Sequence, residues 1–164
     1  MKKYEFTGET KRVELWNRTA TLHRIKATVE FGFVKVGELG GWIEKEENLS
    51  HEGKAWVCGD AEVWGNAEVC DDAKVCGDAE VCGDAEVFLA SHVLVMGSVG
   101  SRNDFTTFFR DKDNEITVKC GCFLGKIDKF LEKVTQTHGN NKYALVYRAA
   151  VEVAKLQIEL TERK

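Results

Sequence analysis

The sequence predicts an all-β parallel β-helix built from six-residue repeats, with an N-terminal β cap and a C-terminal α+β module that ends in two helices. Valine recurs every six residues from Val57 to Val99, and a small residue precedes each valine by two positions. Gly-Asp or Gly-Asn follows four of these eight valines after one residue and favours a turn, because both residues tolerate a left-handed backbone. Apolar residues spaced by three and four predict the two helices near the C-terminus.

Each repeat is expected to form one short strand and one corner. Alternate residues of a strand point to the same face, so the small residue and the valine would line the interior together. Three repeats then make one eighteen-residue turn of the β-helix. An α-helix is excluded here, because glycine and β-branched valine at a period of six match no helical face. The expected interior valines are Val57, Val63, Val69, Val75, Val81, Val87, Val93 and Val99.

The segments on either side of the repeats are expected to close the β-helix. Residues 13–16 and 21–25 alternate between polar and apolar and predict a hairpin. Trp42 and Ile43 would cover the first end, since an uncovered end exposes unpaired strand edges. The sequence thus predicts an N-terminal β cap, the β-helix and a C-terminal cap, which comprise residues 1–54, 55–102 and 103–164.

The C-terminal part reads as two strands followed by two helices. Residues 105–109 and 116–120 are strand-like and are joined by a polar turn. The first helix is predicted from Ile127, Phe130, Leu131 and Val134, which are spaced at i, i+3, i+4 and i+7. The second helix would begin after Asn140 or Asn141, because asparagine caps helix N-termini well. Its apolar stripe comprises Tyr143, Tyr147, Ala150, Val151, Ala154 and Ile158.

The composition indicates a globular protein and narrows its partners. Charged residues make up 30% of the chain and hydrophobic residues 43%, with a net charge of −4. This balance argues against an overall electrostatic attraction to a nucleic acid polymer or an anionic membrane. No apolar run reaches the length of a membrane helix, and the first residues lack the apolar core of a secretory signal. A cytoplasmic protein is therefore expected, with its six cysteines as free thiols.

Several side chains are expected to point outward from the repeats. Trp56, Trp64 and Phe88 occupy such positions, and exposed aromatic residues on neighbouring turns would suit a buried partner surface. They favour a homotrimer.

The repeats also bring possible metal ligands near one another. The eighteen-residue turn would place Cys58 beside Cys76, about 4.8 Å apart, which is the spacing of neighbouring strands. No four thiols converge as a structural zinc site requires. Asp60 and Asp78 would stack at the corners, where calcium or water could be their partner. Solvated corners are the favoured interpretation, and no metal site or cofactor is predicted.

The repeat and three further blocks of sequence together resemble a known group of proteins. The repeat Ala-x-Val-x-Gly-[Asp/Asn] resembles the hexapeptide repeat of left-handed β-helix proteins, which include acyltransferases and γ-class carbonic anhydrases. The further blocks Gly40-Gly41-Trp42-Ile43-Glu44, Gly100-Ser101-Arg102-Asn103-Asp104 and Cys120-Gly121-Cys122 make the chain similar to small phage and prophage hexapeptide-repeat proteins of unassigned function. The resemblance implies a left-handed β-helix, a homotrimer and a location in the cytoplasm of a bacterial host.

The richest polar cluster follows the last repeat and predicts a ligand site. Guanidinium groups, hydroxyls and an amide together suit phosphate or ribose recognition. Gly121 would let a ligand approach the backbone, and the start of the second helix would favour an anion. The alternative is that these side chains form turns, caps and packing contacts. The candidate residues are Ser101, Arg102, Asn103, Asp104, Thr106, Thr107, Arg110, Lys119, Gly121, His138, Asn140 and Asn141.

The sequence supports three hypotheses of function. The first is a non-catalytic phage protein that binds a phosphate-containing, nucleotide-derived small molecule and so acts as a sponge for a host immune signal in anti-defence. The second is an acyltransferase, for which His92 is the candidate general base because it lies on the repeats. The third is a structural or protein-docking trimer. A carbonic anhydrase of the γ class would need three zinc-binding histidines, and the repeats hold one.

Overall fold

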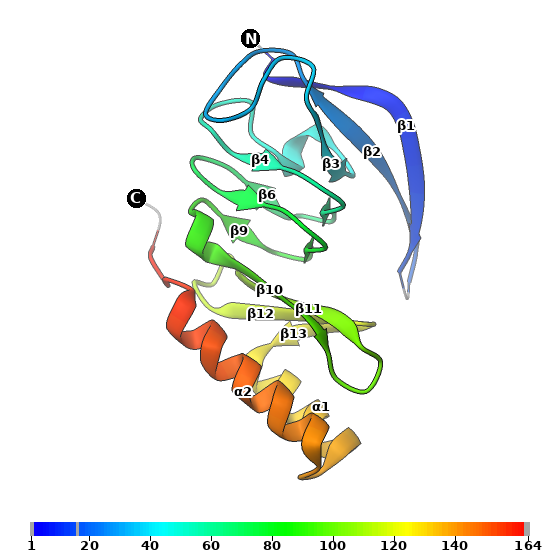
Figure 1. The fold of residues 1–164 in the computed structure, drawn as a ribbon, viewed down its shortest axis with the longest axis vertical. Coiled ribbons are helices and arrows are strands. Elements are labelled where there is room, and N and C mark those ends of the chain that lie inside the picture. The colour runs from blue at the N-terminus through cyan, green and yellow to red at the C-terminus, as the bar shows by residue number, and fades with distance from the viewer. Residues whose placement is uncertain (1, 16, 163–164) are drawn as a thin grey trace.

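The structure of the protein is a computed structural model that describes residues 2–15 and 17–162 (Figure 1). A long hairpin runs beside a stack of very short strands, and a second sheet with two helices follows at the other end. The N-terminal strands are β1 (Tyr4–Glu14), β2 (Thr19–Ala27) and β3 (Leu39–Ile43). The short strands are β4 (Trp56–Val57), β5 (Glu62–Val63), β6 (Glu68–Val69), β7 (Lys74–Val75), β8 (Glu80–Val81) and β9 (Glu86–Val87).

The remaining elements form the C-terminal part. They are β10 (Val93–Val99), β11 (Asp104–Arg110), β12 (Ile116–Cys120), β13 (Phe123–Lys126), α1 (Ile127–His138) and α2 (Lys142–Gln157). Single-turn 3₁₀ helices, η1 (Glu46–Asn48) and η2 (Ala90–His92), flank the short strands. None of the helices formed by the described residues is long and apolar enough to cross a membrane.

The prediction of a long, regular left-handed β-helix is wrong. The described residues form several small sheets, parallel and antiparallel strands are mixed in them, and they make no closed solenoid. One sheet has the strand order β1-β2-β3-β5-β8, with antiparallel pairs in the hairpin and parallel pairs from β3 onward. The sheet β10-β11-β12-β13 is antiparallel throughout. The chain is therefore a mixed fold of small sheets, and the two predicted C-terminal helices are present.

The repeats produce only short parallel ladders because each contributes two residues in strand conformation. Val57 pairs with Val75, and Val69 pairs with Val87, in each case eighteen residues apart. Each corner then takes the next repeat to a different ladder. The ladders β4-β7 and β6-β9 therefore contain two strands each.

The repeat pattern was predicted to run to Val99, but it ends at Val87. It ends there because β10 lies between two cores. Val93 and Val95 pack against the core of the short strands. Leu94 and Met96 point the other way and pack against the core under α1 and α2. A strand with apolar residues on both faces follows a period of two, and β10 accordingly pairs antiparallel with β11.

The interior positions of the repeats are filled as their residue types predict. The valines of β4 to β9 and the alanines two residues before them are at most 1% exposed. Burying one such valine contributes about 1.5–3 kcal/mol. The stack of small and branched side chains is thus a major source of stability in this part of the molecule.

A glycine takes the left-handed backbone at most corners, as at Gly59 with φ 62°. A Cβ at Gly59 would also lie 3.2 Å from the backbone nitrogen of Gly77, the equivalent residue of the neighbouring corner. At one corner Asp71 occupies this position, with φ 54°. An L-residue there carries a backbone strain that glycine avoids.

Replacing Asp71 with glycine is therefore expected to raise the free energy of unfolding by about 1 kcal/mol. Urea unfolding followed by circular dichroism measures the change. Asp72→Gly is the matched control, because Asp72 has no positive φ and glycine there adds only chain entropy. A loss of stability in Asp71→Gly would contradict the assignment of strain to this corner.

The outward aromatic residues are covered within the chain, contrary to prediction. Trp56 is 4% exposed and packs edge-on against Phe31, while Trp64 is 4% exposed and lies under the hairpin beside Leu22. Phe88 is 8% exposed. The predicted hairpin is present in a different register: residues 21–25 pair with residues 6–12, and Val13 and Glu14 pair with Ala20 and Thr19. Residue 16 of that prediction lies outside the described residues.

The prediction of six free thiols is also wrong. Cys58 and Cys76 form a disulfide across β4-β7, with their Cα atoms 4.7 Å apart. Neighbouring parallel strands bring equivalent residues to this separation, which falls in the range that a disulfide spans. Cys70, Cys82, Cys120 and Cys122 form no disulfide with another described residue.

Candidate functional site

A cavity of about 390 Å³ opens between α1 and the turns of the C-terminal sheet, and we call it the α1 pocket. The β10–β11 turn contributes two polar residues, the β12–β13 turn contributes the cysteines, and α1 forms the opposite wall. The lining residues are Ser101, Arg102, Cys120, Cys122, Phe123, Phe130, Lys133, Val134, Thr137, His138 and Tyr147. With Tyr147 of α2, the pocket therefore gathers residues from four separate stretches of the chain.

The floor of the α1 pocket is aromatic. Phe130 and Tyr147 are 3% and 6% exposed, and their rings meet edge to face with centroids 5.6 Å apart. Phe123 packs against Phe130 at 5.5 Å, and the His138 ring stacks near Tyr147 at 5.9 Å. Rings arranged in this way can receive a planar group of a ligand.

Two cationic side chains at the α1 pocket lack a counter-ion in the described part of the chain. Arg102 leaves the β10–β11 turn, and Lys133 leaves α1 on the opposite wall. Neither side chain makes a hydrogen bond or an ion pair with a described residue. Both are exposed, so their charges stay hydrated and available. Guanidinium and ammonium groups on facing walls suit an anionic ligand.

Tyr147 lines the α1 pocket, and its hydroxyl donates a hydrogen bond to the Cys120 sulfur. Burial first, and then the charge of Cys120 and this hydrogen bond, together raise the pKa of Tyr147 to about 12. The hydroxyl is therefore protonated at neutral pH. Gly100, with φ 81°, passes so close to this hydroxyl that a Cβ would overlap it.

Gly121 leaves space for the side chain of Arg102 rather than for a ligand. Its φ is 57°, and a Cβ on Gly121 would overlap the guanidinium group of Arg102. The sequence predicted that this glycine lets a ligand approach the backbone. Arg102 takes that space instead, so Gly121 supports the site by leaving room for the guanidinium.

The β11 residues of the predicted cluster lie outside the α1 pocket. Thr106, Thr107 and Arg110 are at most 2% exposed. The Thr107 hydroxyl accepts a hydrogen bond from the Glu80 amide at 3.0 Å, and Arg110 donates to the Glu86 carbonyl at 2.8 Å. Thr107 and Arg110 thus dock the C-terminal sheet onto the short strands, which was the alternative interpretation of the cluster. Thr106 instead donates to the Cys120 sulfur at 3.4 Å, within the C-terminal sheet.

Asn140 and Asn141 have local roles at the helix ends. Asn141 caps α2, and its side chain accepts a hydrogen bond from the Ala144 amide at 3.1 Å. The Asn140 side chain accepts one from Arg148 at 3.1 Å. Of the twelve predicted residues, Ser101, Arg102 and His138 line the α1 pocket.

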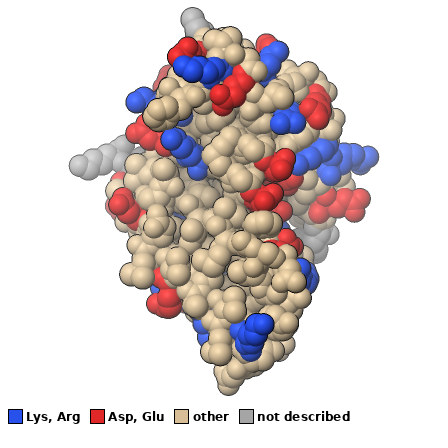
Figure 2. Space-filling view, viewed as in Figure 1, with Lys and Arg blue, Asp and Glu red and all other residues tan. Residues whose placement is uncertain are grey.

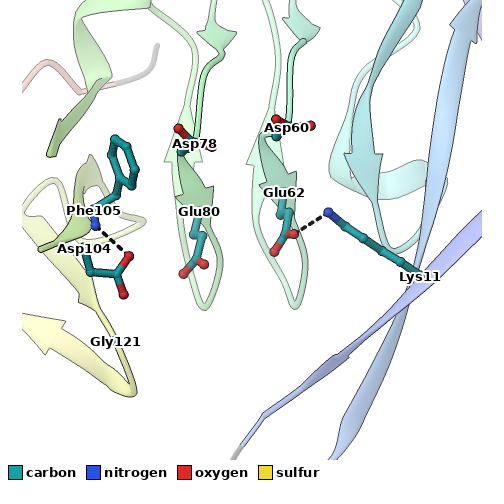
Figure 3. Close-up of a pocket in the computed structure, with 8 residues that line it drawn as sticks. All are labelled: Lys11, Asp60, Glu62, Asp78, Glu80, Asp104, Phe105 and Gly121. Carbon is teal, nitrogen blue, oxygen red and sulfur yellow. Dashed lines mark hydrogen bonds and ion pairs between the residues drawn. The ribbon is translucent and has the colours of Figure 1, made fainter. Parts of the chain in front are cut away.

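Asp104 faces a different hollow, an acidic groove of about 390 Å³ that Figure 3 shows in close-up. Glu62 and Glu80 lie side by side there on β5 and β8, and Lys11 reaches across to Glu62 at 2.6 Å. The predicted Lys119 also pairs with Glu80, at 3.3 Å. The lining residues are Lys11, Asp60, Glu62, Asp78, Glu80, Asp104, Phe105 and Gly121. Such a groove repels phosphate, and no group of three or more acidic, histidine or cysteine residues in the described chain is arranged to hold a metal ion.

Asn103 forms the turn between Arg102 and Asp104, with φ 50°. Asparagine tolerates this left-handed backbone better than most residues do. The turn sends its two charged neighbours in different directions, since Arg102 lines the α1 pocket and Asp104 lines the acidic groove.

His92, the candidate general base of the acyltransferase hypothesis, is buried. It is 0% exposed, and its Nδ1 accepts hydrogen bonds from the amides of Phe88 and Leu89, both at 3.2 Å. Burial and the nearby charge of Arg110 lower the pKa of His92 to about 4. A general base needs a free lone pair that substrate can reach. His92 has neither, so it is a structural residue in this fold.

No family model matches the chain, and no curated protein matches it. The ligand class of the α1 pocket therefore has to be inferred from the residues that form it.

Several residues of the α1 pocket were not among the predicted ones. Phe130, Lys133, Val134 and Thr137 were missed, and with the predicted His138 they are spaced at i, i+3, i+4, i+7 and i+8 along α1. This spacing puts them on one face of the helix. The signal was thus present in the sequence, although the prediction used the apolar members only to place the helix.

Proposed function

We propose that the protein binds a small molecule carrying a phosphate or a similar oxyanion in the α1 pocket. The observation that carries this proposal is that Arg102 and Lys133, which pair with no other described residue, face one cavity. A hydrogen bond to a charged group contributes about 1.5–3 kcal/mol. The two cations would therefore give an oxyanion most of its affinity.

A nucleotide-derived ligand fits this pocket best among phosphate compounds. Its base would lie against the rings of Phe123, Phe130 and Tyr147, since bases stack well on aromatic side chains. The cavity of about 390 Å³ falls in the usual range for small-molecule sites. Together with the phage resemblance, this supports a sequestering protein that removes a nucleotide signal from the host without converting it.

The two alternatives have less support. An acyltransferase would need His92 as its base, and the Nδ1 atom of His92 is occupied and buried. The homotrimer stays a prediction, and the outward aromatic side chains on which it rested are covered by this chain itself. A protein-docking role would have to use another surface.

Arg102→Ala is expected to weaken binding of the phosphate ligand by about 10- to 100-fold, because it removes one charge-assisted contact. A thermal-shift screen would first find a ligand among cyclic dinucleotides, ADP-ribose, NAD and acetyl-CoA. A ligand at 100 times its dissociation constant adds roughly 2.7 kcal/mol of stability. Calorimetric titration would then compare the wild type with Arg102→Ala and Lys133→Ala.

Lys129→Ala is the matched control for Lys133→Ala. Lys129 lies one turn earlier on α1, pairs with Glu132, and does not line the pocket. The Lys129→Ala variant should bind the ligand with the affinity of the wild type. Equal affinity in the wild type, Arg102→Ala and Lys133→Ala would refute the α1 pocket as the site.

A further inference from the structure

The helix α2 carries a second apolar face that the fold leaves uncovered. Its inner face packs on the C-terminal sheet, and its outer face presents Leu145, Ala149, Val153 and Leu156. Leu145, Val153 and Leu156 are 61%, 45% and 89% exposed. Steps of four, four and three residues align these side chains on one side of the helix. Figures 1 and 2 share one view, and charged side chains are sparse over the lower part, where the helices lie.

A helix with one buried face normally presents polar residues to water on the other. Single exposed leucines are common and need no explanation, but a continuous stripe of apolar residues marks an interaction surface. The outer face of α2 is such a stripe over about three turns of helix. It therefore needs a partner with a matching apolar surface.

The charges beside the stripe indicate which partner fits. Glu152 and Lys155 flank the same side of it, are 70% and 49% exposed, and lie 3.5 Å apart as an ion pair within one chain. When two copies of a helix pack antiparallel, the same flank of each helix faces its equivalent in the other. With the two-fold axis near Val153, Glu152 of each copy would face Lys155 of the other. A parallel pair would bring no opposite charges across the seam.

The sizes of the apolar residues agree with the same arrangement. An axis near Val153 sets Val153 against its own equivalent and Ala149 against Leu156 of the other copy. Small residues opposite large ones let two surfaces interdigitate. Both the charges and the side-chain volumes of this face are thus self-complementary.

We propose that two copies of the chain associate through the outer face of α2, with their α2 helices antiparallel. The partner is a second copy of this chain. One helix face from each copy makes a contact at the low end of specific interface sizes, so the dimer is weak and depends on concentration. Tyr147 lies on the inner face of α2, so this dimer does not depend on the ligand-binding proposal.

Sedimentation equilibrium of the full chain over a wide concentration range tests the proposal. The wild type should show a monomer–dimer equilibrium, and Leu156→Glu should remain monomeric throughout. Leu156 is 89% exposed, so the substitution leaves the fold intact, which circular dichroism would verify. Leu124→Glu is the matched control, because Leu124 is also exposed, at 45%, but belongs to β13. The Leu124→Glu variant should dimerise as the wild type does.

Charge exchange tests the antiparallel arrangement directly. Glu152→Lys alone and Lys155→Glu alone should each weaken the dimer, because like charges then face each other. A mixture of the two variants should form a heterodimer more tightly than either variant forms its own dimer. A monomeric wild type, an oligomer that persists in Leu156→Glu, or a mixture that associates no better than its components would overturn the proposal.

Discussion

Replacing Arg110 with alanine is expected to lower the free energy of unfolding by about 3 kcal/mol. Arg110 is 2% exposed and donates to the Glu86 carbonyl at 2.8 Å and to Asn114 Oδ1 at 3.0 Å. Its guanidinium group also packs over Phe88, 4.9 Å from the ring centroid. Alanine leaves buried acceptors without a donor and removes this packing. This loss of unfolding free energy is at the low end of the range for breaking a buried ion pair, because the Glu86 side chain keeps 25% of its surface exposed.

Lys112→Ala provides the control for Arg110→Ala. Lys112 also joins the C-terminal part to the short strands, through Asp84 at 3.3 Å, but its side chain is 58% exposed. An exposed pair contributes at most about 1 kcal/mol. Urea unfolding of the two variants should therefore differ by about 2 kcal/mol. If Arg110→Ala is as stable as Lys112→Ala and instead loses ligand affinity, Arg110 belongs to the binding site after all.

Lowering the pH from 7 to 4 is expected to remove up to about 3 kcal/mol of stability through His92 alone. The folded state lowers the pKa of His92 to about 4, whereas an unfolded histidine titrates near its usual value of 6.5. Between these values the unfolded chain binds a proton that the folded chain does not. The stabilisation is therefore complete above pH 6.5 and disappears as the pH falls towards 4.

His92→Asn isolates this contribution from that of the carboxylates. The Asn side-chain oxygen can accept the amide hydrogen bonds that Nδ1 accepts in the wild type, and it does not titrate. The variant should show a smaller slope of unfolding free energy against pH between 6.5 and 4.5, measured by urea unfolding at several pH values. Equal slopes in both proteins would mean that His92 becomes protonated in the folded state.

The interior of the repeat region could be predicted from the sequence, but its assembly could not. A period of six determines that Val57 and Val75 point inward and lie eighteen residues apart. It does not determine where the pattern ends. Val93 fits both the six-residue period and simple alternation, and the alternation prevails because Leu94 and Met96 contact a second core. Val99 packs on that second core as well, after a break in the β10–β11 register between Met96 and Val99. The apolar residues on both faces of this strand were the signal.

The residues that cover the outward side chains of the repeats could not be predicted from the sequence either. The sequence indicates that Trp56 and Trp64 leave the interior of the repeats, but not what covers them. Contacts with the N-terminal hairpin and the loop after it join residues far apart in the sequence. Phe31 against Trp56 and Leu22 beside Trp64 are two such contacts.

The candidate site was predicted in part because neighbours in sequence separate in a hairpin. Arg102 lies in the turn and faces the α1 pocket, whereas Thr106 and Arg110 lie in β11 and are buried against other elements. Only the register of β10 with β11 distinguishes these positions. Lys133 lies some thirty residues further on and joins Arg102 through the packing of α1 on the sheet.

The eighteen-residue pairing limits how this protein can change in length. Val57 with Val75, and Val69 with Val87, make each repeat part of one of the short ladders. Deleting six residues would keep every valine inward but shift all later repeats to the next ladder. The C-terminal sheet, which holds the short strands through Thr107 and Arg110, would then face a different side from the hairpin. Insertions and deletions that preserve both ends of the molecule should therefore come in multiples of eighteen residues. The protein can thus be lengthened or shortened only by three repeats at a time.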